Sequence, residues 1–357
     1  MHAASSIMMQ EVTNGRFILG VGSQTKGQVR TQVGIDPESP AKMARDMVLA
    51  IQSLMNGEGH YEGEYYKLNT GPRLVIHATG KKPPPIYFSG VNALMLGLSG
   101  ELCDGMLAHP IFSKKDFEDV VWPLVDKGLK KSNKQRDDFK MCALPMIWVL
   151  GEGTDRAEAY SRGKRNLANY FSTKAYSGYM DSHGWSKEKD QIREVWLDAM
   201  KSGKPIDGDM MEDILSEDIV DEVCIIGDPQ EVREKVIERY DGLADSLYFY
   251  AFHDSFPTRS EEEEGIKVEQ NLLRVIDAFK EICLEQGVEF HTNEAVQSVN
   301  IEEKTIQSIV TDKRTFETDI VVGSADYNHV DSKLLPPKYR NYNDSYWQKK
   351  TFSPSFC

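Results

Sequence analysis

The sequence lacks the long apolar run that a membrane-spanning helix needs. No stretch reaches about 18 consecutive apolar residues, and the first residues do not show the charged and apolar regions of a signal peptide. Positive charge is also in short supply, because 42 lysines and arginines stand against 56 aspartates and glutamates, a formal net charge of −14. Such a field repels nucleic acid and anionic lipid surfaces. We therefore expect no nucleic-acid partner and no membrane partner.

Cysteine is scarce and scattered. The five cysteines are far apart, are odd in number and form no C-x-x-C pair: Cys103, Cys142, Cys224, Cys283 and Cys357. This spacing is typical of reduced thiols in a cytoplasmic protein and argues against a structural metal site. A Ser-His-Asp set, a P-loop and a metal-ligand helix are absent too. We predict a cytoplasmic location and no metal, and these motifs identify no catalytic residue.

The sequence has instead the pattern of an α/β protein. Its 357 residues are enough for one domain of about 250 residues and an appendage. Apolar segments predict strands at residues 17–22, 83–90, 105–110, 139–150 and 246–251, with a short apolar segment at 224–229. Helices are predicted at residues 2–13, 40–55, 91–102 and 117–130, through 155–200, and from a cap at Asp228. This alternation favours βαβ units and a parallel sheet.

The segment from Gly15 to Gln24 organises the rest of the chain. An apolar run with a glycine on each side predicts a buried parallel strand, and Gly20, Gly22 and Ser23 follow where it ends. Ligands of α/β proteins bind beyond the carboxyl ends of the strands, where a residue without Cβ lets backbone amides approach an anion. We expect the chemistry at this exit. The alternative is a tight strand-to-helix turn that holds no ligand.

Five segments in order carry a family resemblance: GRFILGVGSQ, PPPIYFSGV, ELCDGMLAHP, IIGDPQEVREKV and DGLADSLYFY. With them, residues 1–258 resemble the second half of a bacterial-luciferase-like flavin or deazaflavin oxidoreductase, and they are most similar to the branch that uses the deazaflavin coenzyme F-420 (F420). The resemblance implies a partial (β/α)8 TIM barrel that contains strands four to eight. The first three strands, which in the family carry much of the substrate pocket, have no counterpart in this sequence.

The resemblance also implies a cofactor site at three strand exits. The first exit would face the ring and ribityl chain, the second would bring backbone amides near the cofactor phosphate, and the third would complete the phosphate cradle. The corresponding residues are Gly22, Ser23 and Gln24, then Ser89, Gly90 and Val91, then Ala108, His109 and Pro110. Unsatisfied amides at the start of a following helix favour an anion. Each stretch also fits plain barrel architecture, and His109 also fits an ordinary loop histidine.

The function implied by the resemblance is an oxidoreductase of the luciferase-like monooxygenase type. It would transfer hydride with F420 or FMN, acting on a small organic substrate, and the coenzyme would supply the demanding chemistry. Tyr248, Tyr250 and His253, at the exit of the last strand, are further candidates for a pocket, although alternating aromatic residues in a strand also fit core and helix packing. Trp148 and the aromatic residues of 160–185 fit a substrate lid or ordinary helix packing.

The composition changes after an acidic run, Glu261 to Glu264, which predicts a solvated linker at residues 259–267. Residues 268–357 resemble an internal fragment of the FAD-dependent phytoene desaturase family, in GVEFHTNEAV, DIVVGSADYNHV and KLLPPKYRNY. Here we predict a small α+β appendage: a helix at 272–283, a strand and turn at 287–296, and strands at 305–310 and 316–322. The G-x-G-x-x-G fingerprint is absent, which makes FAD a weaker candidate than F420 or FMN.

Two partial resemblances in one chain leave three functional hypotheses open. The first is the oxidoreductase. The second is a non-catalytic remnant, from a chimeric or truncated reading frame rather than a natural fusion, and the missing strands favour it. The third is a carotenoid desaturase activity, which only the tail favours. An incomplete barrel would also expose two sheet edges, which would allow homo-oligomers to form.

Overall fold

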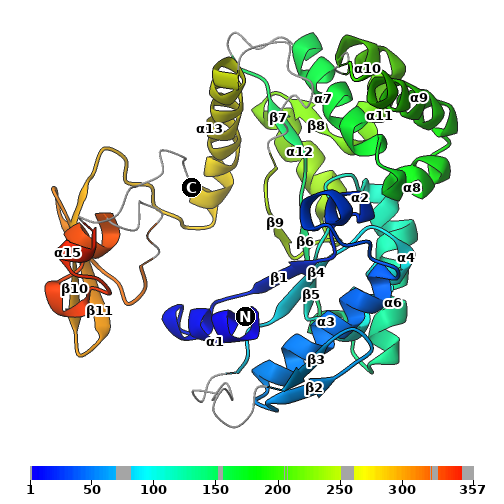
Figure 1. Cartoon of the computed structure of the whole chain (residues 1–357). Coiled ribbons are helices and arrows are strands. Elements are labelled where there is room, and N and C mark those ends of the chain that lie inside the picture. The colour runs from blue at the N-terminus through cyan, green and yellow to red at the C-terminus, as the bar shows by residue number, and fades with distance from the viewer. Residues whose placement is uncertain are drawn as a thin grey trace. The chain divides into compact units, whose positions relative to one another are not determined.

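The computed structural model describes residues 2–69, 82–151, 156–204, 206, 208–250, 261–321, 323 and 329–347. The chain forms two compact units, residues 1–281 (unit 1) and residues 282–357 (unit 2). Figure 1 labels their helices and strands. Each unit has a sheet of its own, parallel in unit 1 and antiparallel in unit 2.

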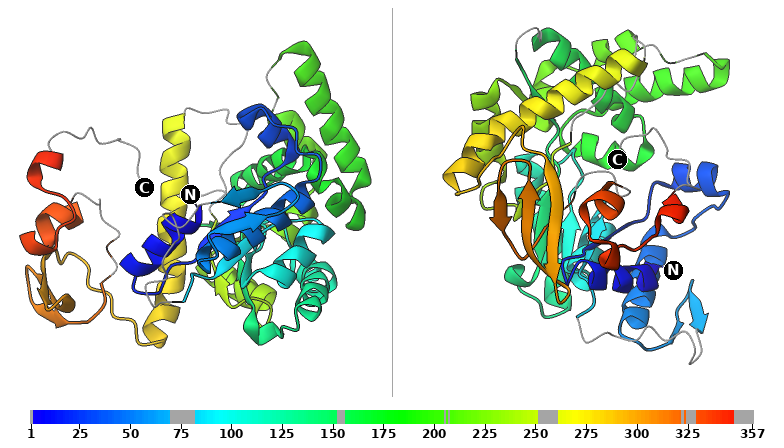
Figure 2. Two further views of the ribbon diagram at one scale, coloured as in Figure 1. Left: turned by 60° about the horizontal axis from the view of Figure 1, so that its bottom comes forward. Right: turned by 90° about the vertical axis from the view of Figure 1, so that its left-hand side faces the viewer.

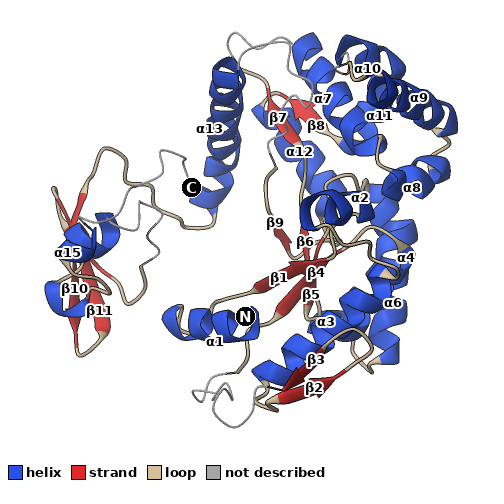
Figure 3. Ribbon diagram, viewed as in Figure 1, coloured by secondary structure: helices blue, strands red, loops and turns tan. Residues whose placement is uncertain are grey.

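Unit 1 is built on a five-stranded parallel sheet (Figure 3). Its strands lie side by side in the order in which they occur along the chain: β1 (Leu19–Gly22), β4 (Ile86–Ser89), β5 (Gly105–Leu107), β6 (Lys140–Ala143) and β9 (Ser246–Leu247). Every neighbouring pair is parallel, which confirms the predicted parallel sheet. The carboxyl ends of these strands therefore share one edge of the sheet.

The first strand differs from the prediction in its burial. Among the described residues β1 pairs only with β4, so it forms one edge of the sheet. Leu19 is buried, whereas Gly20 and Gly22 are exposed and Ile18 is 46% exposed. The expectation of a buried strand was wrong because an apolar run predicts a strand without showing whether neighbours cover both of its edges.

Most helices of unit 1 form where they were predicted. These are α1 (His2–Val12), α3 (Pro40–Met55), α4 (Ala93–Leu102), α6 (Trp122–Lys131) and α12 (Pro229–Tyr240). Asn14 and Gly15 end α1 with left-handed φ angles of 51° and 87°, as their residue types favour. Asp228 caps α12, because its carboxylate accepts the amide hydrogen of Glu231 at 2.9 Å. Short helical segments follow β1 and precede α6: α2 (Lys26–Gln28), η1 (Val29–Val33), α5 (Lys114–Asp116) and η2 (Phe117–Val121).

A small hairpin packs beside α3. It consists of β2 (His60–Glu62) and β3 (Lys67–Asn69), which pair antiparallel. The buried carboxylate of Asp46 accepts the amide hydrogens of Tyr65 and Tyr66, at 2.6 and 2.8 Å, and the hydroxyl hydrogen of Tyr61. These hydrogen bonds fix the hairpin turn to the helix.

The strand predicted at residues 139–150 is two strands. β6 ends at Ala143, and β7 (Ile147–Val149) pairs in parallel with β8 (Ile225–Gly227) in a separate two-stranded sheet. Pro145 lies between them, and its carbonyl oxygen accepts the amide hydrogen of Tyr250 at 3.1 Å. Because proline has no amide hydrogen to donate to a ladder, the apolar run cannot continue as one strand.

The helical region predicted at residues 155–200 is divided into three helices, α7 (Arg156–Phe171), α8 (Ser177–Ser182) and α9 (Ser186–Ser202). Two shorter helices, α10 (Gly208–Ile214) and α11 (Glu217–Val223), lead into β8. Trp148 is buried in the core beneath α7, with the Arg162 guanidinium 5.0 Å from the centre of its ring. For Trp148 the structure therefore favours packing over a lid.

The acidic run begins a helix and is not a linker. Residues 261–285 form α13 (Glu261–Glu285), drawn as one uninterrupted yellow helix in Figure 2. Glutamate is a good helix former, so a run of this residue type is compatible with a helix as well as with a solvated linker. The boundary between the two compact units falls after Glu281, within α13.

A buried asparagine attaches α13 to unit 1. The side-chain oxygen of Asn271 accepts the amide hydrogen of Val149 at 2.7 Å, and its amide group donates to the carbonyl oxygen of Ile147 at 2.9 Å. Asn271 thus satisfies both backbone groups along one edge of β7, which explains why α13 belongs with the first unit as far as residue 281.

Replacing Asn271 with alanine should therefore lower the free energy of unfolding of unit 1. The variant leaves a buried amide hydrogen and a buried carbonyl oxygen unpaired, and we expect a loss of about 2 kcal/mol. Leu272→Ala is the matched control, because Leu272 is the exposed neighbour on the same helix. Urea denaturation followed by far-UV circular dichroism measures both. Equal losses in the two variants would contradict a specific role for the asparagine.

Unit 2 is a small α+β unit, as predicted for the appendage. Its strands, orange in Figure 2, are β10 (Val296–Glu302), β11 (Thr305–Thr311) and β12 (Thr315–Glu317), and they form an antiparallel sheet. Short helical segments follow: η5 (Val330–Leu334), η6 (Pro337–Tyr339) and α15 (Asp344–Trp347). The carboxylate of buried Asp331, in η5, accepts hydrogen bonds from the backbone amide of Asn341 at 2.8 Å and from the indole nitrogen of Trp347, in α15, at 3.0 Å.

Two predicted strands of this unit differ from the structure. Residues 288–295 are not a strand, and β10 begins only at Val296, because no neighbour in the described part of unit 2 pairs with that alternating segment. Val288 and Phe290 are accordingly exposed. The strand predicted at 316–322 is shorter, since β12 ends at Glu317.

Candidate functional site

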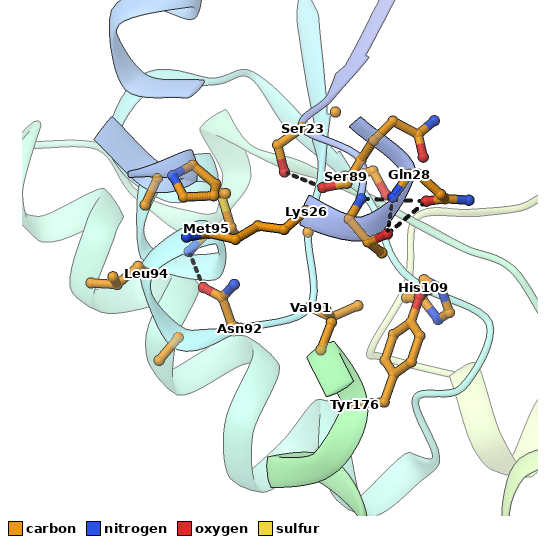
Figure 4. Close-up of a pocket in the computed structure, with 18 of the residues that line it drawn as sticks. Ser23, Lys26, Gln28, Ser89, Val91, Asn92, Leu94, Met95, His109 and Tyr176 are labelled. Carbon is orange, nitrogen blue, oxygen red and sulfur yellow. Dashed lines mark hydrogen bonds between the residues drawn. The ribbon is translucent and has the colours of Figure 1, made fainter. Parts of the chain in front are cut away.

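A cavity of about 800 Å³ lies at the carboxyl ends of β1, β4 and β5 (Figure 4). It collects seven of the nine residues predicted for a cofactor site: Gly22, Ser23, Gln24, Ser89, Gly90, Val91 and His109. The strand register accounts for this, because Gly22 is paired with Ser89 and β5 runs parallel beside β4. Three segments that are far apart in the sequence therefore open into one hollow.

The other two predicted residues, Ala108 and Pro110, do not line the cavity. Both are buried, and the amide of Ala108 donates to the carbonyl oxygen of Cys142 at 2.8 Å. In an extended segment successive side chains point to opposite sides, so His109 faces the cavity while its two neighbours face the core.

The start of α4 forms one wall of the cavity. Asn92 caps this helix, with its side-chain oxygen accepting the amide hydrogen of Met95 at 3.1 Å. The first residues of the helix, Ala93 and Leu94, line the cavity beside it. Amide groups in a first helical turn have no partner within the helix and carry the positive end of its dipole. This wall therefore suits a negatively charged or oxygen-rich group.

The two predicted glycines of the site, Gly22 and Gly90, differ in whether the surrounding atoms leave room for a side chain. A Cβ at Gly90 would lie 2.4 Å from Cβ of Met95, so packing against α4 excludes any side chain there. A Cβ at Gly22 would lie 3.5 Å from the carbonyl oxygen of Ser89, which is an ordinary contact. Helix packing thus explains Gly90, whereas no neighbour in the described part of the chain requires a glycine at position 22.

The polar loop after β1 continues beyond the predicted Gln24 and adds Thr25, Lys26 and Gln28 to the cavity lining, none of which was predicted. Gln24 has a left-handed φ of 56°, and the chain turns there into α2, where Thr25 and Gln28 form a capping box. The ammonium group of Lys26 donates to the carbonyl oxygen of Glu38 at 3.2 Å. Among the described residues that line the cavity, Lys26 is the one lysine or arginine, and no carboxylate is present. The one sequence feature that could have indicated this cation is the position of Lys26, four residues after Gly22.

Two tyrosines complete the lining next to His109. The ring of Tyr170 lies edge-on to the imidazole, with centres 5.3 Å apart, and the hydroxyl oxygen of Tyr176 lies 3.0 Å from Nε2 of His109. Figure 4 shows His109 and Tyr176 together at one side of the cavity. Burial lowers the pKa of His109 to about 4 and raises the pKa of Tyr176 to about 12. Both side chains are therefore uncharged near neutral pH.

The remaining sequence candidates lie elsewhere. Tyr248 is 64% exposed and does not line the cavity. The hydroxyl of Tyr250 accepts a hydrogen bond from that of Tyr170 at 3.2 Å, behind the cavity wall. His253 lies outside the described residues.

The described part of the chain offers no metal centre. No group of three or more histidine, cysteine, aspartate or glutamate side chains is arranged there to hold an ion. Four cysteines are free thiols, and burial raises the pKa of Cys103 and Cys224 to about 12, so both remain protonated. No helix among the described residues combines the length and apolar character needed to cross a bilayer.

Comparison with known proteins finds one family along most of the chain. The sequence model of the family described as "Luciferase-like monooxygenase" matches residues 1–246. An uncharacterized protein of Mycobacterium tuberculosis is 24% identical over 246 residues, which is 67% of this chain and 70% of that protein. A second protein of that organism, named as a putative coenzyme F420-dependent oxidoreductase, is 23% identical over 253 residues, 66% of this chain and 70% of its own length.

A solved structure shows a related fold. The coenzyme F420-dependent tetrahydromethanopterin reductase of Methanopyrus kandleri superposes with a TM-score of 0.54 at 21% identity, covering 78% of each chain. A carotenoid 3,4-desaturase of Haloarcula japonica is 35% identical over 81 residues, which is 23% of this chain and 16% of the desaturase. The reductase supports an α/β fold with a parallel sheet, and the desaturase shares a short segment.

Proposed function

Because the chain belongs to the luciferase-like monooxygenase family, we propose that it is an oxidoreductase that binds F420 or FMN in the cavity at the ends of β1, β4 and β5. The reaction would transfer hydride between the coenzyme and a small organic substrate. The bound coenzyme supplies the redox chemistry, and the protein binds it, orients it and tunes its surroundings. The name of the Mycobacterium tuberculosis relative favours F420.

One observation carries this proposal: residues from three separate strand exits line one cavity whose charge suits an anion. Its volume of about 800 Å³ lies within the usual range for a ligand site, about 300 to 1,000 Å³. The start of α4 and the ammonium group of Lys26 face the same hollow, and no carboxylate lines it among the described residues. A phosphate-bearing coenzyme fits these surroundings, because helix amides and a lysine stabilise phosphate.

The residues take the following roles in this proposal. Gly22, Ser23 and Gln24 contact the ring and the ribityl chain. The backbone amides at Ser89, Gly90 and Val91, where β4 leads into α4, bind the phosphate, and Lys26 adds its positive charge. His109 contacts the coenzyme from the end of β5. Ala108 and Pro110 do not touch the coenzyme; they are buried on the core side and hold His109 in place.

Titration with F420 and with FMN, followed by absorbance and fluorescence of the coenzyme, tests the proposal. We expect one of them to bind at micromolar concentration or below. Lys26→Gln should weaken that binding by about 5- to 10-fold, because it removes a cation from the phosphate's surroundings. Lys115→Gln is the matched control, since it makes the same change in net charge on an exposed lysine outside the cavity.

Failure of both coenzymes to bind at micromolar concentration would overturn the oxidoreductase proposal and favour a non-catalytic remnant. Equal weakening by the two lysine variants would show that net charge, and not the cavity, governs binding. Neither result would bear on the fold of unit 1, which is tested separately by unfolding the protein without a ligand.

We also propose that β1, β4, β5, β6 and β9 correspond to strands of the second half of the family barrel, with β7 and β8 in the insertion. The parallel order of the sheet supports this assignment. In the same proposal residues 1–258 are the luciferase-like part, which the family match over residues 1–246 supports, and residues 268–357 are the desaturase-like part of a chimeric chain. FAD bound to the purified protein would instead favour a desaturase activity.

A further inference from the structure

The imidazole of His109 has a different partner on each nitrogen. Its Nδ1 lies 3.3 Å from the backbone nitrogen of Ile111, which donates its hydrogen to the ring. Its Nε2 lies 3.0 Å from the hydroxyl oxygen of Tyr176. The ring is held between these contacts by Phe112 and Tyr170, whose ring centres are 6.5 and 5.3 Å from its own. The histidine is therefore fixed in orientation.

The backbone contact decides where the ring carries its proton. A backbone amide can only donate, so Nδ1 must be an unprotonated acceptor. A neutral imidazole has one proton, which then lies on Nε2 and is donated to the Tyr176 oxygen. The lowered pKa of His109 agrees with a neutral ring at ordinary pH. The opposite tautomer would place two N–H groups against each other at Ile111.

This tautomer leaves the hydroxyl hydrogen of Tyr176 available. The tyrosine oxygen accepts from His109, so its own hydrogen points elsewhere, and no other acceptor for it occurs among the residues that the structure describes. Tyr176 is only 8% exposed, yet it lines the cavity together with His109 and Tyr170. A buried hydroxyl is costly to leave without an acceptor, which favours a ligand atom in that place.

We propose that Tyr176 donates a hydrogen bond to a carbonyl oxygen or oxyanion of the molecule bound in the cavity, and that His109 is the positioning residue that directs this hydroxyl toward it. The proposal rests on the proposed function only for the identity of that molecule. No proton leaves either side chain. A donor in this position stabilises negative charge that develops on the acceptor oxygen, and it does so most strongly where water is excluded.

Nitrogen NMR of the ligand-free protein tests the geometry without a coenzyme. Long-range proton–nitrogen correlations distinguish the two neutral tautomers and the imidazolium, and the His109→Gln spectrum assigns the signals. We expect His109 to be neutral at pH 7 with its proton on Nε2. A proton on Nδ1, or a charged ring at that pH, would overturn the proposal.

Binding to the variants tests the role of the hydroxyl. Tyr176→Phe should weaken whichever of F420 or FMN the wild-type protein binds by about 10-fold, since an acceptor oxygen loses its donor. Tyr160→Phe is the matched control: Tyr160 is 9% exposed and donates to the Asp221 carboxylate at 2.6 Å, outside the cavity. We expect this control to change the affinity by less than about 2-fold.

Two substitutions of His109 separate positioning from packing. His109→Gln keeps an N–H donor near the Nε2 position and should lose less affinity than His109→Leu, which should lose at least as much as Tyr176→Phe. A Tyr176→Phe protein that folds normally and binds as tightly as the wild type would overturn the proposal. If neither coenzyme binds, the proposed function fails, and the tautomer of His109 alone decides this inference.

Discussion

Replacing Gly128 with alanine should destabilise unit 1 by about 3 kcal/mol or more. Gly128 lies where α6 crosses α4, and a Cβ there would come within 2.1 Å of the carbonyl oxygen of Gly97 and 2.7 Å of the amide nitrogen of Glu101. Both atoms belong to the backbone of α4, so neither can rotate away and the two helices must separate. Overpacking of this kind commonly costs about 1 to 3 kcal/mol, and backbone contacts place it at the upper end.

Gly97→Ala provides the matched control for this prediction. Gly97 lies on α4 at the same helix pair, but a Cβ there would meet its nearest neighbour, the carbonyl oxygen of Leu124, at 3.8 Å. An alanine fits at that distance, and its better helix propensity should add up to about 1 kcal/mol of stability. The two glycines should therefore respond with opposite signs.

Urea denaturation measures both changes in the free energy of unfolding. The comparison holds if the m-value of each variant equals that of the wild type. A Gly128→Ala protein within about 0.5 kcal/mol of the wild type would show that α4 and α6 do not pack as closely as described. Because the first turn of α4 forms a wall of the cavity, the same variant should also weaken coenzyme binding.

Unit 1 should lose up to about 3 kcal/mol of stability from His109 alone as the pH falls from 7 to 4. The pKa of this histidine is about 4 in the folded protein against 6.5 for an exposed one, because burial disfavours the charged ring. Above pH 6.5 the ring is neutral in both states and the protein has its full stability. Below that value the unfolded chain takes up a proton first, so stability declines until the folded protein also binds one near pH 4.

The comparison with His109→Gln isolates this contribution, since glutamine does not titrate and the other ionisable groups are shared. The stability of the variant relative to the wild type should rise steadily between pH 6.5 and pH 4. Thermal or urea unfolding at a series of pH values provides the measurement. Parallel profiles for the two proteins would contradict a buried, neutral histidine.

The candidate site shows which of its residues can be predicted from the sequence and which cannot. Gly22 was predicted because it follows an apolar run, and Ser89, Gly90 and His109 because the family resemblance implies a cofactor at the next two strand exits. The parallel register brings those strand ends together. Tyr176 was predicted only as one of the aromatic residues of 160–185, which fit a substrate lid or ordinary helix packing. It is 67 positions from His109, and no periodicity in either segment indicates that the two side chains meet.

The same contrast applies to the segment between residues 261 and 281. Its acidic residues predicted a linker, yet the chain forms α13 there, and the bond from Asn271 to β7 joins it to unit 1. An asparagine in a helix is unremarkable in a sequence. It becomes important only because an unpaired strand edge lies opposite it.

The sequence by itself determined the acidic charge, which is a matter of composition, and the alternation of strands and helices, which depends on neighbours along the chain. Only the tertiary structure decided that β1 is an edge strand, that β7 pairs with β8 in a separate sheet, that Lys26, Tyr170 and Tyr176 join the cavity, and which partner lies at each nitrogen of His109. These features arise from contacts between residues distant in sequence, or from hydrogen-bond directions that exist only once the chain is folded.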